Sequence, residues 1–256
     1  MAQHQSARQL DDAQLEDFDV EYVRDDRWRT IEEKLEAKFG SGAFSFLDIG
    51  GGNGVFCDRI LDRFPLSLGT VLDSSELLLS RNRHHPRKTL VDDTVENLGL
   101  RFPRGTFDVI FVNWLLHHLV GDSYRETLQN MTTTLSRASA LLSPRGAISI
   151  FENLYDGALI DNWPGAFIYH VTSSRVLAPI TRRLGANTAG VGVCFLSTRK
   201  WSTVIEQAGL RVATFTRTPK RRVPLLVRTL LHLQNLTVGH FWCERATADS
   251  FAAKIG

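Results

Sequence analysis

FLDIGGGNGVFC, residues 46–57, is the stretch of sequence that decides the fold of this chain. Apolar residues surround the acid Asp48, three glycines follow at 50–52, and Gly54 precedes a run with helical spacing. This order predicts a strand, a tight loop and a helix. Glycine permits positive φ angles and lets a ligand approach the backbone closely, so we expect the loop to bind a nucleotide-like molecule.

The spacing of the glycines narrows the choice of ligand. A dinucleotide fingerprint needs a small residue three places after its second glycine, where this chain has Val55. A phosphate-binding P-loop needs a Gly-Lys-Ser/Thr ending, which this stretch lacks. The pattern acid-x-Gly-x-Gly-x-Gly is filled by Asp48, Gly50, Gly52 and Gly54. It resembles the first motif of the class I S-adenosylmethionine-dependent methyltransferases; a tight turn without a ligand is the alternative.

Around this loop, apolar runs typical of strands alternate with runs of helical periodicity. Strands are expected at 44–49, 66–72, 89–91, 107–114, 146–151, 211–216 and 240–245. Helices are expected at 22–39, 55–64, 76–79, 123–142 and 201–210. This alternation predicts an α/β, doubly wound, mostly parallel seven-stranded sheet with helices on both faces. The order of the motifs over residues 46–153 is similar to that of the class I methyltransferases, which implies an antiparallel last strand.

The expected domain organisation is one methyltransferase domain, residues 41–256, preceded by an N-terminal arm and lid helix at 1–40. Tyr22 and Trp28 lie near the start of that helix, where a lid over a cofactor can be built. A place for Trp28 in the core is the alternative.

Two further segments lie outside the common pattern. Residues 155–195 form an insertion after the fifth strand, and we expect it to cap the substrate pocket. Residues 219–236 mix basic residues with leucines at near-helical spacing. They are expected either to pack as a helix on the sheet edge or to touch an anionic membrane or a lipid-like substrate.

Polar residues follow the predicted strands, and the carboxyl ends of parallel strands meet at one edge of a sheet. Asp73, roughly twenty residues after the glycines, is placed to accept both ribose hydroxyls of an adenosine. Either Asp92 or Asp93 is expected to accept the adenine amino group. The cofactor-binding residues expected for S-adenosylmethionine and its product S-adenosylhomocysteine are Asp48, Gly50, Gly51, Gly52, Gly54, Asp73, Ser74, Asp92, Asp93, Thr94, Asn113 and Trp114.

Histidine is the candidate general base because imidazole is both neutral and basic near pH 7. His117 and His118 follow the fourth strand at the start of an expected helix, and His170 lies in the insertion. Adjacent helical residues diverge by about 100°, so at most one of the pair faces the pocket, and His117 is preferred. A purely structural role for the pair is the alternative. No metal site is predicted, because Glu152, Asp156, Asp161 and His170 have no fixed ligand spacing.

The segment after the fourth strand bears on the methyl acceptor. Methyltransferases that act on nucleobase amines resemble one another in an Asn/Asp-Pro-Pro-aromatic segment, whereas residues 113–116 here read NWLL. This departure favours an oxygen, nitrogen or carbon nucleophile of a small molecule, in secondary-metabolite, lipid or quinone tailoring. An RNA methyltransferase that uses the basic C-terminal half and a non-methylating member of the fold are the alternatives.

Composition sets the remaining expectations. The chain of 256 residues is 43% hydrophobic and 23% charged and has no apolar run of bilayer length or secretory signal core, so a cytoplasmic protein is expected. Three widely spaced cysteines argue against a disulfide framework. The net charge of +2 conceals a basic half: residues 175–228 hold eleven Arg or Lys and one acid, Glu206. Such a half suits an anionic substrate, a membrane surface or RNA, or is simply solvated.

Overall fold

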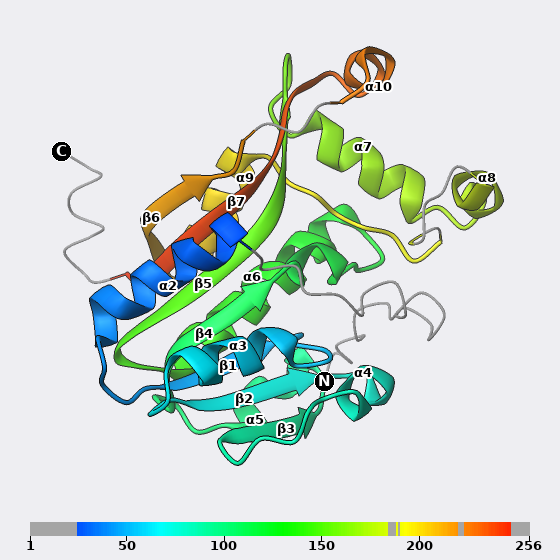
Figure 1. Ribbon diagram of the computed structural model, residues 1–256. Helices are drawn as coiled ribbons and strands as arrows, with labels where there is room; N and C mark the ends of the chain where they lie inside the picture. Colours follow the sequence, from blue (N-terminus) through cyan, green and yellow to red (C-terminus); the bar gives the residue numbers. More distant parts are fainter. Residues whose placement is uncertain (1–24, 184–187, 189, 220–222, 247–256) are drawn as a thin grey trace.

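The computed structural model describes residues 25–183, 188, 190–219 and 223–246 (Figure 1). The strands are β1 (Ser45–Ile49), β2 (Leu68–Asp73), β3 (Lys88–Asp92), β4 (Phe107–Asn113), β5 (Leu142–Gly157), β6 (Leu210–Arg217) and β7 (Leu233–Arg245). The α-helices are α2 (Asp25–Phe39), α3 (Val55–Arg63), α4 (Glu76–Ser80), α5 (Leu98–Arg101), α6 (Tyr124–Leu141), α7 (Trp163–Thr172), α8 (Ala178–Arg183), α9 (Thr198–Gln207) and α10 (Leu225–Leu230). Two short 3-10 turns are η2 (Val95–Asn97) and η3 (Leu116–His118).

The seven strands form one sheet in the order β3-β2-β1-β4-β5-β7-β6. The pairs within β3-β2-β1-β4-β5 are parallel, and β7 is antiparallel to both β5 and β6. The predicted doubly wound sheet with an antiparallel last strand is therefore confirmed. Its parallel strands place the ends of β1, β2, β3 and β4 along one edge.

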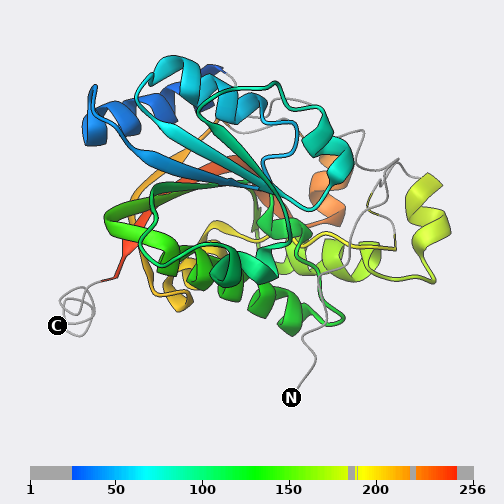
Figure 2. The same ribbon diagram turned by 90° about the horizontal axis from the view of Figure 1, so that it is seen from below.

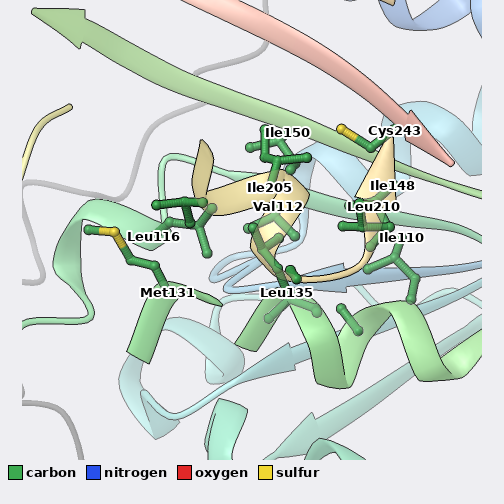
Figure 3. Packing of buried hydrophobic residues seen from close by; sticks show 14 of the residues in the cluster. Ile110, Val112, Leu116, Met131, Leu135, Ile148, Ile150, Ile205, Leu210 and Cys243 are labelled. Carbon is green, nitrogen blue, oxygen red and sulfur yellow. The ribbon is translucent and has the colours of Figure 1, made fainter. Parts of the chain in front are cut away.

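Helices cover both faces of the sheet, and Figure 2 shows the three layers from below. Successive residues of β4 explain why: Ile110 and Val112 belong to one buried cluster, while Val109 and Phe111 belong to the other. Figure 3 shows the first cluster, where side chains of β4 and β5 meet those of α6 and α9. Burial on both faces accounts for the continuous apolar run in β4, as is usual for parallel strands.

Helix α2 packs on the sheet through Trp28, Ile31 and Leu35, all of which are buried. Trp28 meets the ring of Phe56 edge-on, so this tryptophan is a core residue. The predicted lid stays a prediction, because Tyr22 lies outside the described residues.

The structure lengthens two of the predicted strands. β5 begins at Leu142 rather than Gly146 and continues past the predicted end at Phe151 to Gly157, and β7 begins at Leu233 rather than His240. The extension of β5 past Phe151 pairs with the extension of β7, with Glu152 opposite Gly239 and Gly157 opposite Leu233. The extended pair forms a two-stranded ribbon beyond the end of β4, because β4 stops at Asn113 opposite Phe151. The insertion therefore begins after Gly157.

The expectation of a packed helix over residues 219–236 is wrong. The described part holds only α10, none of whose residues is buried, and the leucines from Leu233 onward belong to β7. The leucines repeat at near-helical spacing, which concealed the start of the strand. None of the described helices is long and apolar enough to cross a bilayer.

Candidate active site

The glycine loop between β1 and α3 has the backbone that its sequence predicts. Gly50, Gly52 and Gly54 have φ angles of 72°, 50° and 71°, a region that favours glycine. Gly50 N–H donates to Leu72 O at 2.7 Å, and Gly54 N–H donates to Gly51 O at 2.9 Å. A Cβ on Gly51 would lie 2.5 Å from Asp48 Oδ2, so this glycine is required for space. The loop is thus a fixed backbone turn at the carboxyl edge of the sheet.

Asp73, at the end of β2, joins the glycine loop to the next turn. Its Oδ2 accepts from Gly52 N–H and its Oδ1 accepts from Ser75 N–H, each at 2.9 Å. Burial raises the pKa of Asp73, and these backbone donors oppose the shift. A carboxylate has about four acceptor sites, so it can take further donors at this position. The exposed Ser74 follows directly.

Asp48 lies beneath the loop and is 2% exposed. Burial raises the pKa of Asp48 to about 7, and the negative charge of Asp73 adds to the shift. The Oδ2 atom of Asp48 is buried without a hydrogen-bond partner. A buried carboxyl group with a strongly raised pKa and an oxygen that lacks a hydrogen-bond partner is typical of a functional site.

The acids after β3 have different surroundings. Asp93 accepts from Thr94 N–H and Asn97 Nδ2, each at 2.7 Å, and it pairs with Arg101, whose hydrogen bond lowers the pKa of Asp93. Asp92 pairs in register with Asp73 and is exposed. The Asp93 carboxylate is therefore committed to holding the turn around η2, whereas Asp92 is open to solvent.

Asn113 is the last residue of β4, and Trp114 follows it. Both amide atoms of Asn113 are buried without a hydrogen-bond partner. Trp114 has φ of 53°, a rare backbone for a bulky residue that is often found at functional sites. Its N–H donates to Phe151 O at 2.9 Å, and its ring stacks on Phe151 with centroids 5.4 Å apart. The strained residue is thus fixed by β5 next to an unsatisfied amide.

The two histidines follow in η3, a single 3-10 turn rather than the expected longer helix. His117 Nδ1 lies 2.6 Å from Glu152 Oε2. Glu152 is fully buried and directly follows Phe151, the last residue of β5 that pairs with β4. The other oxygen, Oε1, accepts from Leu116 N–H at 2.9 Å. An ionised Glu152 at this position requires a proton on Nδ1 of His117, which leaves Nε2 as an acceptor.

His118 is less suited to accept a proton. Its ring centroid lies 4.1 Å from that of His117, and desolvation together with His117 lowers the pKa of His118 well below its ordinary value. His170 lies on an exposed part of α7, where its ring contacts those of Tyr124 and Tyr169. Among the described residues, no ring contact joins His170 to the pair in η3.

Glu152 is the site residue whose role sequence reasoning missed. Its position as an acid after the predicted fifth strand was visible, but its pairing with His117 depends on how β4 and β5 align. The other acids of that segment have separate partners: Asp156 caps Thr198 and pairs with Arg217, and Asp161 accepts from Ser197 Oγ. In the described part of the chain, no three His, Cys, Asp or Glu side chains form a metal-binding group.

The end of the insertion lies against the histidine pair. Cys194 N–H donates to His117 O at 2.9 Å, and the Phe195 ring lies 5.0 Å from the His117 ring. Phe195 also stacks on Tyr155 of the ribbon, with centroids 4.5 Å apart. Leu196 then bridges to Leu154 in the place that β4 leaves vacant.

Comparisons with known proteins agree with this geometry. Residues 47–148 match the model of a methyltransferase domain. A search of curated proteins found no significant match. Many solved structures share the fold, and three of them illustrate the range. A Leishmania major S-adenosylmethionine-dependent methyltransferase is 15% identical, covers 83% of this chain and 70% of its own, and has a TM-score of 0.55.

The other two are proteins with different named activities. The mitomycin 7-O-methyltransferase MmcR is 21% identical over 86% of this chain and 55% of its own, with a TM-score of 0.52. The cyclase SpnF is 12% identical over 86% of this chain and 81% of its own, with a TM-score of 0.57. Identities this low establish the fold alone. Residues 47–148 are thus a methyltransferase domain, in a chain whose strand order and glycine loop are those expected of the class I S-adenosylmethionine-dependent methyltransferase fold.

Proposed function

We propose that this methyltransferase transfers a methyl group from S-adenosylmethionine to an oxygen, nitrogen or carbon nucleophile of a small molecule, with His117 as general base and Glu152 as its positioning residue. The buried His117–Glu152 pair at the carboxyl edge of the sheet is the observation that carries the proposal. Tailoring of a secondary metabolite, a lipid or a quinone is the setting that we propose for this reaction.

The cofactor fits the polar groups at this edge. Asp73 would hold the ribose hydroxyls, and the loop around Gly52 would lie against the amino-acid part. Asp92 would take the adenine amino group, since Asp93 is committed to Arg101 and Asn97. The unpartnered atoms of Asp48 and Asn113 lie at the ends of adjacent strands, where a bound cofactor would satisfy them.

Proton transfer is the chemical task left to the side chains. When bound, S-adenosylmethionine supplies a methyl group on a positively charged sulfur. His117 Nε2 would accept the proton that the nucleophile loses as it takes the methyl group, with neutral S-adenosylhomocysteine as the leaving group. Glu152 fixes the imidazole tautomer and stabilises the imidazolium that results. Holding the two reactants in contact supplies most of the remaining acceleration.

A small acceptor is favoured by what surrounds His117. The Phe195 ring lies beside the His117 ring and stacks in turn on Tyr155. Aromatic walls with few polar groups are typical of small-molecule pockets. The NWLL segment lacks the prolines of the enzymes that grip nucleobase amines. The fold shared with the mitomycin 7-O-methyltransferase is compatible with an oxygen nucleophile.

Calorimetry followed by a transfer assay tests this function. The protein is titrated with S-adenosylmethionine and S-adenosylhomocysteine, and the labelled cofactor is then incubated with phenols, catechols, quinols and total RNA. Binding of both cofactors, with label in a small hydroxylated or aminated molecule, is the expected result. Label only in RNA, together with RNA retention that falls steeply with salt, would favour the RNA alternative.

The role of His117 needs its own comparison. His117→Ala is expected to lower turnover by about 10²–10⁴-fold while leaving S-adenosylhomocysteine affinity unchanged. His118→Ala and His170→Ala serve as the parallel variants. If all three variants keep normal turnover, histidine is not the base.

A further inference from the structure

Large apolar side chains are exposed on three segments beyond the cofactor-binding edge. Leu159 is 81% exposed and Leu225 and Leu226 are 77% and 71% exposed. We define the apolar rim as the exposed residues Leu159, Ile160, Trp163, Leu225, Leu226 and Leu230. Exposed apolar groups in such number usually mark an interaction surface.

These segments are neighbours in space. Ala158 N–H donates to His232 O at 2.7 Å, which joins the turn of Leu159 to the end of α10. Trp163 N–H donates to Ile160 O at 3.1 Å, which joins the same turn to the start of α7. Figure 1 shows α10 and α7 at one end of the molecule, beside the tip of the β5–β7 ribbon.

Helix α10 has no packing role that would explain its leucines. Residues 224–230 are all exposed, and Leu226 and Leu230 are four residues apart, so they share one face of the helix. A six-residue helix is too short to be stable in water by itself, so its apolar face is expected to gain a partner.

The stretch of sequence that carries and follows most of the rim is rich in basic residues. Residues 162–243 contain eleven Arg or Lys residues and one acid, Glu206. Arg175, Arg183 and Arg228 are exposed on the segments that carry or follow the rim. The acids that are nearest to the rim in the sequence have partners. Asp156 is buried and forms an ion pair with Arg217, and Asp161 accepts a hydrogen bond from Ser197 Oγ.

We infer that the apolar rim docks on an anionic lipid bilayer. Exposed leucines, a tryptophan and basic residues on the same segments, such as Arg228 in α10, are the composition of interfacial membrane-binding surfaces. A second copy of the chain is disfavoured, because a two-fold interface would bring two basic surfaces together. Nucleic acid is disfavoured, because aliphatic side chains gain nothing from a phosphate backbone. Docking would place the start of the insertion at the lipid surface.

Vesicle co-sedimentation of the full chain tests this inference. The probes are vesicles of phosphatidylcholine alone and of phosphatidylcholine mixed with phosphatidylglycerol. We expect binding to the mixed vesicles that weakens at high salt, and little binding to phosphatidylcholine. The double variant Leu225→Ser/Leu226→Ser should lose at least about 10-fold in partition coefficient, because two apolar anchors are removed.

The contribution of charge is measured separately. The double variant Arg175→Glu/Arg183→Glu should lower the partition coefficient on mixed vesicles by about five-fold or more per position. Each basic residue near an anionic surface is expected to contribute about a five-fold gain in binding. Matched controls are Leu100→Ser and Arg104→Glu, exposed positions near the opposite edge of the sheet. Both controls should bind vesicles like the unmodified chain.

Several outcomes would overturn the inference. No binding to mixed vesicles, or equal losses in the rim variants and the controls, would do so. A concentration-dependent dimer that the Leu225→Ser/Leu226→Ser variant abolishes, without vesicle binding, would assign the rim to self-association. S-adenosylhomocysteine binding by every variant serves as the test of folding. Because vesicle binding needs no turnover, its result does not depend on whether His117 is the general base.

Discussion

His117 Nδ1 and Glu152 Oε2 lie 2.6 Å apart, although 35 residues separate them in the sequence. The parallel pairing of β4 with β5, which aligns Asn113 with Phe151, brings the two residues together. Both side chains are buried, so the pair is held in one arrangement before any acceptor binds. Pre-organisation of this kind is what a general base needs.

Glu152→Gln should separate catalysis from binding. We expect turnover to fall about 10²–10⁴-fold, because the amide no longer fixes the imidazole tautomer, while calorimetry shows unchanged S-adenosylhomocysteine affinity. Glu244→Gln is the control, since Glu244 forms an exposed ion pair with Arg211 that contributes little. Equal turnover in the two variants would refute a positioning role for Glu152.

Asn113→Leu should have opposite effects on stability and on binding. Removal of an amide that is buried without partners is expected to raise the free energy of unfolding by about 1–3 kcal/mol. S-adenosylhomocysteine affinity should fall, because the amide would be lost to the ligand. Chemical denaturation and calorimetry measure the two quantities. Asn82→Leu is the contrast: its Nδ2 donates to Gly52 O at 2.8 Å, so both quantities should fall.

Asp48→Asn should show a pH-dependent gain in stability without ligand. The folded pKa of Asp48 is raised from 3.8 to about 7, so the folded state holds this proton more tightly than the unfolded state does. Its contribution to stability is present below pH 4 and is lost as pH rises to about 7. The variant lacks this loss, so its advantage in unfolding free energy should grow from pH 4 to pH 8, by at most about 4 kcal/mol.

The same variant should bind S-adenosylmethionine more weakly, because a carboxylate near the positively charged donor is replaced by a neutral amide. Thermal unfolding across pH and calorimetry at pH 8 provide the measurements. A stability advantage that does not change with pH would show that Asp48 titrates normally.

Gly54→Ala should damage the glycine loop. Gly54 has φ of 71°, and a Cβ there would lie 1.8 Å from Asn82 Oδ1. We expect a loss of about 1–3 kcal/mol in unfolding free energy and weaker cofactor binding. Gly99→Ala, in α5 with open space around it, should be neutral or stabilising by about 0.5–1 kcal/mol. Similar melting temperatures for the two variants would contradict the strain at Gly54.

The sequence predicted the sheet well because its central strands β1 and β4 are buried on both faces and its parallel strands end in or are followed by polar residues. The β1 run and its glycine loop, the apolar β4 and the acids after β2 and β3 all lie at the expected edge. The lengths of β5 and β7 escaped prediction, since the leucines before Val238 suggest a helix and only their partner strand makes them extended. The His117–Glu152 contact depends on strand register, and the choice between Asp92 and Asp93 depends on where Arg101 falls. The periodicity of the sequence predicts neither the His117–Glu152 contact nor the pairing of Asp93 with Arg101.

The β5–β7 ribbon has an evolutionary consequence. Residues 152–157 and 233–239 leave the main sheet as an arm, and this arm carries the insertion on one side and α10 on the other. The hydrogen bonds of Gly50 and Gly52 join the glycine loop to Leu72, Asp73 and Asn82, none of which lies on this arm. If the insertion selects the acceptor as proposed, related enzymes can diverge in acceptor through residues beyond Glu152 while the nucleoside half stays constant.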